Sequence, residues 1–338
     1  MTLLDHCDEI LSHGAPREEW LRVRRLGLGG SDCSAVMGMA NEKYASPYTV
    51  WEDKTGRAPE VDESEPMRWG NLLEPIIREE AMRRLGLSFT LPGTLRSRER
   101  PWQQANLDGL ASDGGIIECK NTSLWLAADW NGQIPDHAEL QCQHNMAVSG
   151  ATHGYACGLV GGSRLVIARV ERDDALIELI NGEEHQLWHE HILTDTPPPM
   201  DPSEATRAAL VRRFGLEDRA VEFEGEKAVA ALNAVEARES YRIAEREAAQ
   251  MKKQAENELR LLLAGANRGT VAGETIVKFV GGTWAPKKFE EAEPEMAALY
   301  RTKVDVVDSK ALRAAEPEVW ARYQAQNIKT FPLTEKGA

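Results

Sequence analysis

Hydrophobic residues recur with a helical period in the first quarter of the chain. In several segments between residues 17 and 85 the apolar positions are three or four residues apart, which is typical of amphipathic helices. Gly27 and its neighbours interrupt the first of these segments, and Gly86 stops the last. The pattern predicts helices over 17–26, 31–39, 47–56 and 70–85.

The period shortens at residue 93, where brief segments separated by glycine begin. The turn signal Asp113-Gly114-Gly115 indicates that the second and third of these segments form a hairpin. The order of elements predicts an α/β (α+β) fold with a central mixed β-sheet flanked by helices. The predicted strands cover 93–97, 102–110, 115–120, 153–160 and 163–171, and the predicted helices cover 136–148 and 173–193.

A proline-rich segment, residues 196–202, is the clearest break in the chain. It predicts an N-terminal domain over 1–195, a linker over 196–202 and a C-terminal extension over 203–338. The extension is rich in Ala, Glu, Arg and Lys, a composition that favours helices. We expect one long helix over 226–263, a small β unit over 270–288 and a short helix over 309–323.

Composition narrows the class of protein. The chain has 338 residues, 42% of them hydrophobic, and no stretch reaches the eighteen or so apolar residues of a membrane helix. The N-terminus carries Asp5, Asp8 and Glu9, which is unlike a secretory signal, so we expect a cytoplasmic protein with no membrane partner. The five cysteines are odd in number and lack CxxC spacing, which argues against a disulfide framework or a structural zinc site.

The net charge of −14 is unfavourable for a DNA-binding surface taken as a whole. Arginines nevertheless gather locally at 17–25, 78–84 and 96–100. Such clusters are usually solvated faces of helices or strands, so they permit a DNA site without indicating one.

Two carboxylates and one lysine are placed where a hairpin brings residues together. Glu118 and Lys120 are two apart on the third strand and share a face, and Asp108 lies across the ladder. Like-charged carboxylates repel one another, and a hard divalent cation such as Mg²⁺ compensates this because it prefers oxygen ligands. The alternative is an exposed hairpin with ordinary surface charges. Ile116 and Ile117 favour the site, because they make the third strand half-buried.

The series Asp108, Glu118, Cys119, Lys120 resembles the PD-(D/E)xK nuclease motif, with Leu107 where a proline often stands. More specifically, the first two hundred residues resemble the YqaJ-type viral recombinases, relatives of phage lambda exonuclease. The resemblance implies a restriction-endonuclease-like PD-(D/E)xK core. The segments that carry it are, in chain order, 20–24 with 29–32, 69–74, 106–109, 118–120, and 141–143 with Met146.

The resemblance implies roles for residues around the motif. Asp108, Glu118 and the backbone carbonyl of Cys119 would hold Mg²⁺, which Mn²⁺ can replace in such enzymes, and Glu74 would add a third carboxylate. Lys120 would position the attacking water, and Gln141 would line the same cleft.

A second group is expected to hold the DNA end. Arg24 and Ser31 match residues that bind a terminal 5′-phosphate in such relatives, and a guanidinium and a helix N-terminus both suit a phosphate. Asn106 stands where lambda exonuclease has a serine for the same phosphate, so that contact is changed. Met67 falls where the relative uses an apolar wedge to split the duplex, although a methionine at such a place more often packs in a core.

These features together favour a 5′→3′ double-strand DNA exonuclease of phage recombination in a bacterial host. It would act on DNA ends, leave 3′ single strands for an annealing protein, and form a homo-oligomer, with a trimer as the first expectation. The alternatives are an endonuclease of the same fold, a non-catalytic DNA-binding or scaffold protein, and a hydrolase of small phosphates. An iron–sulphur nuclease from CRISPR adaptation is disfavoured, because such enzymes need a late cysteine cluster and the last cysteine here is Cys157.

A histidine series and the C-terminal tail lie outside this predicted site. His185, His189 and His191 have the spacing of a metal cluster, but a solvated or half-buried helix face is the commoner arrangement. The tail resembles that of longer phage members of the family, and we expect an arm that touches DNA, a neighbouring subunit or a partner. The tail segments concerned are 283–284 and 307–312, followed by Pro317, Trp320 and Tyr323.

Overall fold

The computed structural model describes residues 5–59, 64–215 and 219–278, together with the single residues 294 and 314. The chain divides into two compact units, residues 1–217 and residues 218–338. The predicted helix over 309–323 and the tail segments that carry the family resemblance lie outside the described residues.

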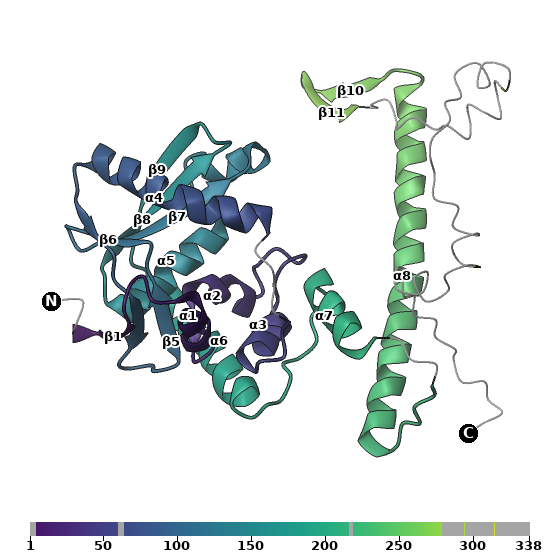
Figure 1. Cartoon of the computed structure of the whole chain (residues 1–338). Coiled ribbons are helices and arrows are strands. Elements are labelled where there is room, and N and C mark those ends of the chain that lie inside the picture. Colours follow the sequence, from purple (N-terminus) through teal and green to yellow (C-terminus); the bar gives the residue numbers. More distant parts are fainter. Residues whose placement is uncertain (1–4, 60–63, 216–218, 279–293, 295–313, 315–338) are drawn as a thin grey trace. The chain divides into compact units, whose positions relative to one another are not determined.

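The first unit is built around a five-stranded mixed sheet with the order β3-β6-β7-β8-β9 (Figure 1). Neighbouring strands are antiparallel except for β7 and β8, which run parallel. This confirms the predicted mixed sheet. The strands are β3 (Phe89–Thr90), β6 (Gly109–Ala111), β7 (Ile116–Thr122), β8 (His153–Val160) and β9 (Arg164–Glu171).

A helix covers each face of this sheet. Successive residues of a strand point to opposite faces, and Ile116 packs with Met146 of α5 while Ile117 packs with Met82 of α4. Helix α4 (Glu65–Leu85) is capped at its start by the Ser64 side chain, and helix α5 is Asp136–Ser149. Glu118 and Lys120 alternate in phase with Ile116 and therefore face α5.

A second sheet of four strands has the order β1-β4-β5-β2. It shows that the predicted strand over 102–110 is in fact two strands, since β5 belongs to this sheet and β6 to the other. The break falls at Leu107 and Asp108, where the chain passes from one sheet to the next. The strands are β1 (Cys7–Leu11), β2 (Leu28–Gly29), β4 (Thr94–Ser97) and β5 (Gln103–Asn106).

Short helices surround β5 and β2 and supply much of the remaining core. Tyr48 and Trp51 of α3 are the largest side chains in it and are almost fully buried. The Trp51 indole donates a hydrogen bond to the His191 carbonyl. The elements are α1 (Arg17–Arg24), α2 (Gly30–Val36), α3 (Pro47–Lys54), the 3₁₀ segment η2 (Leu124–Trp130), α6 (Asp174–Gln186) and the π-helical segment η3 (Leu187–Ile192).

Helix α7 (Glu204–Phe214) lies beyond the proline-rich segment but packs within the first unit. Ala209 joins Tyr48 and Trp51 in one apolar cluster, and the Thr206 and Ser46 hydroxyls are hydrogen-bonded at 2.7 Å. The unit therefore extends past the predicted boundary at residue 195, because α7 covers an apolar face of α3 that the local sequence does not reveal.

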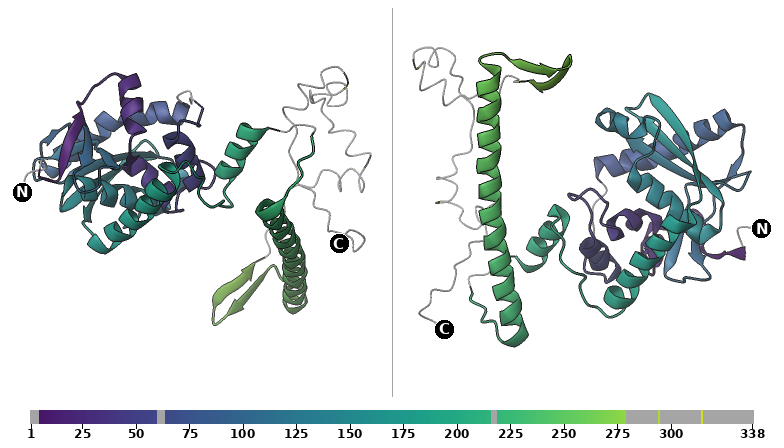
Figure 2. Two further views of the ribbon diagram at one scale, coloured as in Figure 1. Left: turned by 90° about the horizontal axis from the view of Figure 1, so that it is seen from below. Right: turned by 180° about the vertical axis from the view of Figure 1, so that it is seen from behind.

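The second unit contains α8 (Gly225–Leu263) and the hairpin β10 (Arg268–Val271) and β11 (Glu274–Lys278). Figure 2 shows α8 as one unbroken helix, close to the predicted 226–263. The hairpin begins earlier than the predicted β unit, and Gly269 allows Val277 and Leu263 to approach its backbone closely. No described helix has the length and apolar character needed to cross a membrane.

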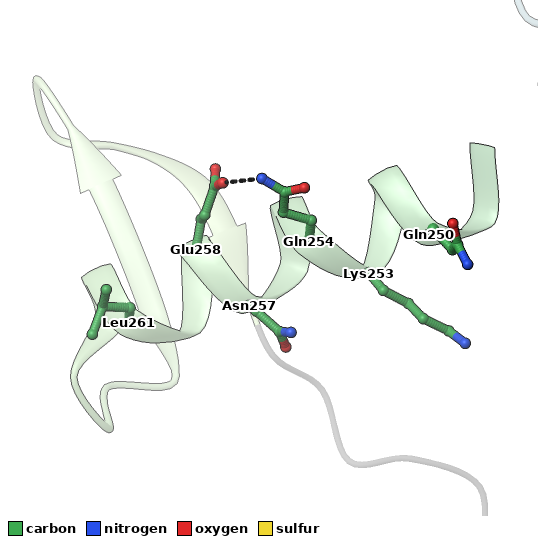
Figure 3. Close-up of a pocket in the computed structure, with 6 residues that line it drawn as sticks. All are labelled: Gln250, Lys253, Gln254, Asn257, Glu258 and Leu261. Atoms are coloured by element: carbon green, nitrogen blue, oxygen red, sulfur yellow. Dashed lines mark hydrogen bonds between the residues drawn. The ribbon is translucent and has the colours of Figure 1, made fainter. Parts of the chain in front are cut away.

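Figure 3 shows a shallow pocket on one side of α8, lined by polar side chains such as Gln250, Lys253 and Asn257. Its only hydrogen bond between lining residues in the described chain joins Gln254 to Glu258 on the same helix, at 3.2 Å.

Candidate active site

The hairpin of β6 and β7 brings Asp108 next to Glu118, as the sequence predicts. Gly109 is paired with Ile117, so Asp108 falls opposite Glu118 just beyond the end of the ladder. One carboxylate oxygen of Asp108, Oδ2, accepts a hydrogen bond of 2.6 Å from the Cys119 backbone N–H. The Asp108 side chain thus accepts a backbone hydrogen bond of β7 just beyond the last residue pair of the β6–β7 ladder.

Glu118 and Lys120 project from β7 towards α5. The Lys120 Nζ lies 2.7 Å from Glu118 Oε1 and donates a second bond of 2.7 Å to Gln141 Oε1 on α5. Glu118 is almost fully buried, whereas the Lys120 side chain is one-quarter exposed. We call Asp108, Glu118 and Lys120 the Asp–Glu–Lys cluster. Asp108 and Lys120 are its partly exposed members.

The cluster holds two carboxylates and one ammonium, so its negative groups outnumber its positive ones. Burial raises the pKa of Asp108 well above its usual value, and the neighbouring Glu118 and Glu74 carboxylates raise it further. Burial also raises the pKa of Glu118, although Lys120 partly offsets this. For Lys120 burial acts to lower the pKa, but Glu118 outweighs it and the pKa is raised, so the ammonium stays charged.

Glu74 lies on α4 near the cluster but is held by its own partner. Arg78 Nη1 donates to Glu74 Oε1 at 2.9 Å and to the Asp108 carbonyl at 2.6 Å. The Arg78 guanidinium is nearly buried and ties α4 to the turn between the two sheets. Glu74 therefore adds negative charge at the site.

The Cys119 backbone faces the same edge of β7 as Asp108. Within a strand, the N–H and the carbonyl of one residue point to the same side. The Cys119 N–H bonds to Asp108, so the Cys119 carbonyl is directed to the side where the carboxylates gather. This orientation suits the metal ligand that the resemblance implies.

Sequence reasoning missed two further side chains of α5 that face this strand. Asn145 Nδ2 donates to Glu118 Oε2 at 3.3 Å, and Asn145 is fully buried. His137 lies at the surface, where partial desolvation by its neighbours lowers its pKa and the charge of Lys120 lowers it further. His137, Gln141 and Asn145 are spaced by four residues, which places them on one helical face, and this spacing was the available signal.

Arg24 is held by acidic neighbours. Its guanidinium bonds to Asp32 at 2.8 Å and to Asp53 at 2.5 Å. The Lys54 ammonium, whose side chain is fully buried, lies 2.7 Å from the other oxygen of Asp32. Burial acts to raise the pKa of Asp32, but Lys54 and Arg24 outweigh it and bring the pKa to about 2. This ionised carboxylate orients Arg24 at the start of α2.

The other two predicted phosphate contacts lie at the same end of the four-stranded sheet. Strand β2 runs parallel to β5, so Ser31 in the first turn of α2 and Asn106 at the end of β5 emerge in the same direction. Ser31 is exposed. Asn106 Oδ1 accepts bonds from the Trp20 indole at 3.2 Å and from the Thr94 hydroxyl at 2.7 Å. Arg24, Ser31 and Asn106 are the residues that the sequence predicts to hold a 5′-phosphate, and we call this predicted group the phosphate pocket.

Met67 stands in the first turn of α4 and is half-exposed. It is therefore not a core residue, contrary to the commoner expectation for a methionine. Trp69, Leu72 and Ile76 on the same helix are also half-exposed, so α4 presents apolar side chains to its surroundings.

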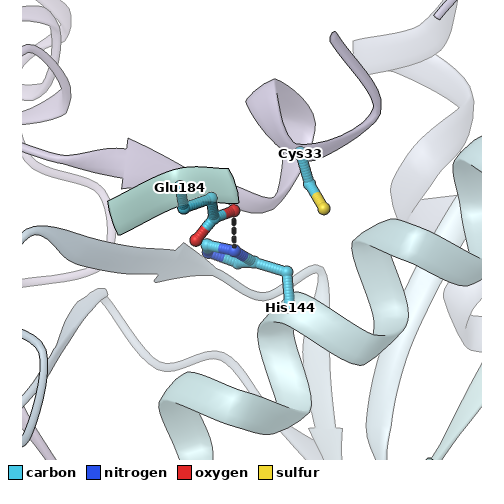
Figure 4. A group of neighbouring side chains, drawn as sticks. All are labelled: Cys33, His144 and Glu184. Atoms are coloured by element: carbon cyan, nitrogen blue, oxygen red, sulfur yellow. Dashed lines mark hydrogen bonds and ion pairs between the residues drawn. The ribbon is translucent and has the colours of Figure 1, made fainter. Parts of the chain in front are cut away.

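A fully buried polar group joins α2, α5 and α6, as Figure 4 shows. His144 of α5 places Nδ1 2.7 Å from Glu184 Oε1 and Nε2 2.9 Å from the Gln104 carbonyl. A carbonyl oxygen only accepts hydrogen bonds, so Nε2 carries a proton. Burial acts to lower the pKa of His144, but Glu184 outweighs it and the pKa is raised, which favours the protonated ring beside the carboxylate.

Cys33 completes this group, and it is the one set of three close His, Cys or acidic ligands in the described chain. Gln103 Nε2 also donates to Glu184, at 2.6 Å, so the carboxylate has donors from several elements. We interpret the group as a structural ion pair that fixes α5 against α6 and β5.

The histidine series 185–191 does not gather as a ligand set in the part of the chain that the structure describes. His185 and His189 instead pack against the Trp102 ring, with ring centroids 5.4 and 4.5 Å from it. The helix-face interpretation agrees with this packing.

Part of the chain is similar to known proteins. Residues 19–152 match the family described as the YqaJ-like viral recombinase domain. The Bacillus subtilis (strain 168) protein called uncharacterized protein YqaJ is 35% identical over 204 residues, which are 59% of this chain and 63% of that protein. The chain thus spans less than two thirds of the length of that relative.

Among solved structures, the chain is similar to an alkaline exonuclease, LHK-Exo, from Laribacter hongkongensis. That match has 25% identity and a TM-score of 0.47, and it covers 53% of this chain and 93% of the other. The same enzyme in complex with dAMP matches at 26% identity with a TM-score of 0.46 and the same coverage.

The matched residues 19–152 contain the Asp–Glu–Lys cluster, Glu74, Gln141 and the whole phosphate pocket. Residues 19–152 are therefore similar to the YqaJ-like viral recombinase domain, and the candidate active site lies within the matched residues.

Proposed function

We propose that this protein is a divalent-metal-dependent deoxyribonuclease that acts as a 5′→3′ exonuclease on double-stranded DNA. The observation that carries the proposal is the Asp–Glu–Lys cluster, in which the buried Glu118 and the half-buried Asp108 meet a lysine bound to Gln141. This arrangement supports hydrolysis of a phosphodiester better than a purely structural role, because burying uncompensated carboxylates destabilises the fold.

The donor set fits a hard divalent cation. Asp108, Glu118 and the Cys119 carbonyl offer oxygen atoms at one edge of β7, and Glu74 adds charge nearby. Oxygen ligands are those that Mg²⁺ and Mn²⁺ prefer. A bound cation would lower the pKa of a water molecule and stabilise negative charge on the scissile phosphate. It would also relieve the repulsion that raises the pKa of Asp108.

The remaining side chains have separate tasks in this proposal. Lys120 is held at 2.7 Å by both Glu118 and Gln141, so its ammonium is oriented without a substrate. It would orient the attacking water and stabilise charge that develops on the phosphate. Gln141 accepts the lysine bond through Oε1 and keeps its amide N–H groups for DNA.

The phosphate pocket would select the 5′ end. Arg24 is fixed by Asp32, and Ser31 presents its hydroxyl and backbone N–H at the surface. A 5′-phosphate would compete with Asp53 for the guanidinium, since Asp53 is the more exposed of the two carboxylate partners of Arg24. Met67 would separate the strands at the duplex end.

The biological setting follows from the same proposal. The product would be a 3′ single strand for an annealing protein during phage or prophage recombination in the bacterial cytoplasm. We expect a ring-shaped homotrimer, which light scattering coupled to size-exclusion chromatography measures directly.

The test uses linear duplex DNA labelled at the 5′ or the 3′ end, with a 5′-phosphate or a 5′-hydroxyl, in Mg²⁺ or in EDTA. We expect Mg²⁺-dependent release of nucleotides from 5′-phosphorylated ends, abolished by Glu118→Ala and Lys120→Ala. Arg24→Gln should reduce the preference for the phosphate. Equal cleavage of closed circular DNA would show an endonuclease instead, and activity that survives Glu118→Ala would refute the site.

A further inference from the structure

Three polar side chains of α5 follow β7 in register. Asn145 contacts Glu118 and Gln141 contacts Lys120, and His137 lies about one helical turn before Gln141 in α5. Four helical residues rise about 6 Å and two strand residues about 6.7 Å, so this antiparallel register can be kept along the whole site. Of these three side chains, Asn145 is the buried one nearest the metal ligands.

The chemistry of the contact fixes which way the Asn145 amide points. A carboxylate accepts hydrogen bonds, so the amide nitrogen faces Glu118 Oε2 and the amide oxygen is turned away from it. Glu118 Oε1 is bound to Lys120. Each oxygen of Glu118 therefore has its own donor, one from β7 and one from α5.

The other end of the Asn145 amide touches α2. A Cβ atom added to Gly30 would lie 2.6 Å from Asn145 Oδ1 and 3.0 Å from Gln141 Cγ. Gly30 carries only a hydrogen atom in that direction, which points at Oδ1 as a C–H···O contact. Oδ1 has no conventional hydrogen-bond donor among the described residues, so this contact is its partner. Gly30 directly precedes Ser31 of the phosphate pocket.

The segment of α5 that carries Asn145 is itself immobilised. His144, the preceding residue, is bound on both ring nitrogens, and the Ser149 hydroxyl donates to the Asn145 carbonyl at 2.7 Å. The side chain of Asn145 is therefore presented from a fixed backbone.

We propose that Asn145 is a positioning residue that fixes Glu118 through Nδ2 and seats the first turn of α2 through Oδ1. It thereby sets the separation between the carboxylates that would hold the metal and the pocket that would hold the 5′-phosphate. This inference rests on the proposed function. A side chain that orients a metal ligand in this way typically changes metal affinity or activity by about 10- to 100-fold when it is removed.

The chain offers a matched control on the same helix. Gln143 is also buried, and it donates to the Glu171 carbonyl at 2.9 Å and accepts from the Asp173 N–H at 3.0 Å. Asn145→Ala and Gln143→Ala each remove a buried amide from α5, but only the first faces Glu118. Both variants should unfold at a lower temperature without metal, so thermal stability alone does not separate them.

The experiment measures Mn²⁺ binding by isothermal titration calorimetry and the Mg²⁺ concentration that gives half-maximal cleavage of 5′-phosphorylated duplex. For Asn145→Ala we expect both the Mn²⁺ dissociation constant and this Mg²⁺ concentration to rise about 10- to 100-fold. Gln143→Ala should stay within about 3-fold of the wild type. Saturating Mg²⁺ should recover most of the cleavage rate of Asn145→Ala.

Gly30→Ala tests the contact with α2, because its methyl group must displace the Asn145 amide without removing it. We expect its metal requirement to rise in the same direction as that of Asn145→Ala. An unchanged requirement would overturn the link to α2, and equal metal requirements in Asn145→Ala and Gln143→Ala would overturn the role of Asn145.

The two proposals fail in different ways. Mn²⁺ titration requires no turnover, so a wild type that binds Mn²⁺ but cleaves no DNA refutes the nuclease and still tests Asn145. A wild type that binds no Mn²⁺ refutes both.

Discussion

The buried pair of His144 and Glu184 gives a prediction about stability. His144→Ala removes one partner and leaves the Glu184 carboxylate buried beside Gln103 and Cys33. Glu184→Gln instead keeps the shape of the side chain and removes its charge. The new amide can donate to His144 Nδ1 and accept from Gln103, so every hydrogen bond of the group can be made by neutral partners.

The two substitutions should therefore differ widely. Both partners are fully buried, so solvent does not screen the charge that is left unpaired. Breaking such a pair by removing one partner costs about 3–5 kcal/mol, and we expect this loss for His144→Ala. For Glu184→Gln we expect a loss of about 1 kcal/mol at pH 8, because a neutral network replaces the ion pair.

The dependence on pH follows from the raised pKa of His144. Its value in the unfolded chain is near 6.5, and the folded value is higher. The contribution of the pair to stability is then complete below pH 6.5 and is lost as the pH rises through the folded pKa. Glu184→Gln should thus be most destabilising near pH 6 and approach the wild type towards pH 9.

Urea unfolding followed by tryptophan fluorescence measures these differences, with the buried Trp51 and Trp130 as reporters. Titrations at pH 6, 7.5 and 9 give the free energy of unfolding for each variant. Equal losses in the two variants, or a gap between Glu184→Gln and the wild type that widens as the pH rises, would refute the ion pair.

Three other predictions concern the site and the domain boundary. Asp108→Asn should raise the metal-free stability at pH 7 and abolish cleavage, because the raised pKa of Asp108 means that its ionised form opposes folding. Thermal denaturation with and without Mg²⁺ measures this, and a lower metal-free stability in the variant would contradict it. Lys120→Met should lower the cleavage rate constant by about 10²–10³-fold with little change in substrate affinity, and a change confined to affinity would contradict its assigned role. In urea titrations, the free energy of unfolding of a chain ending at residue 202 should be about 3 kcal/mol lower than that of a chain ending at residue 217. Loss of α7 leaves Glu52 buried without Arg212 and uncovers Trp51. Equal free energies of unfolding would show that α7 is not part of the unit.

Local sequence determined much of the framework. The turn at Asp113-Gly114-Gly115 and the spacing of Glu118 and Lys120 depend on neighbours a few residues away, and the structure contains that hairpin. Helices α5 and α8 lie close to their predicted ranges because their boundaries are set by glycines and composition. The cluster around Asp108 could be expected from these features because the hairpin alone brings its members together.

Tertiary structure decided the rest. No local pattern shows that the predicted strand over 102–110 breaks at Leu107 so that β5 and β6 join different sheets. The partners of Asn145 and His144 lie 27 and 40 residues away in the chain, and Asp53, one of the two partners of Arg24, lies 29 residues away. Period and propensity describe only which face of an element is apolar, whereas a buried polar side chain is placed by whichever distant group satisfies its hydrogen bonds. The sequence therefore determined the chemistry of the Asp–Glu–Lys cluster, and the packing of α5 and α2 decided how rigidly that cluster is held.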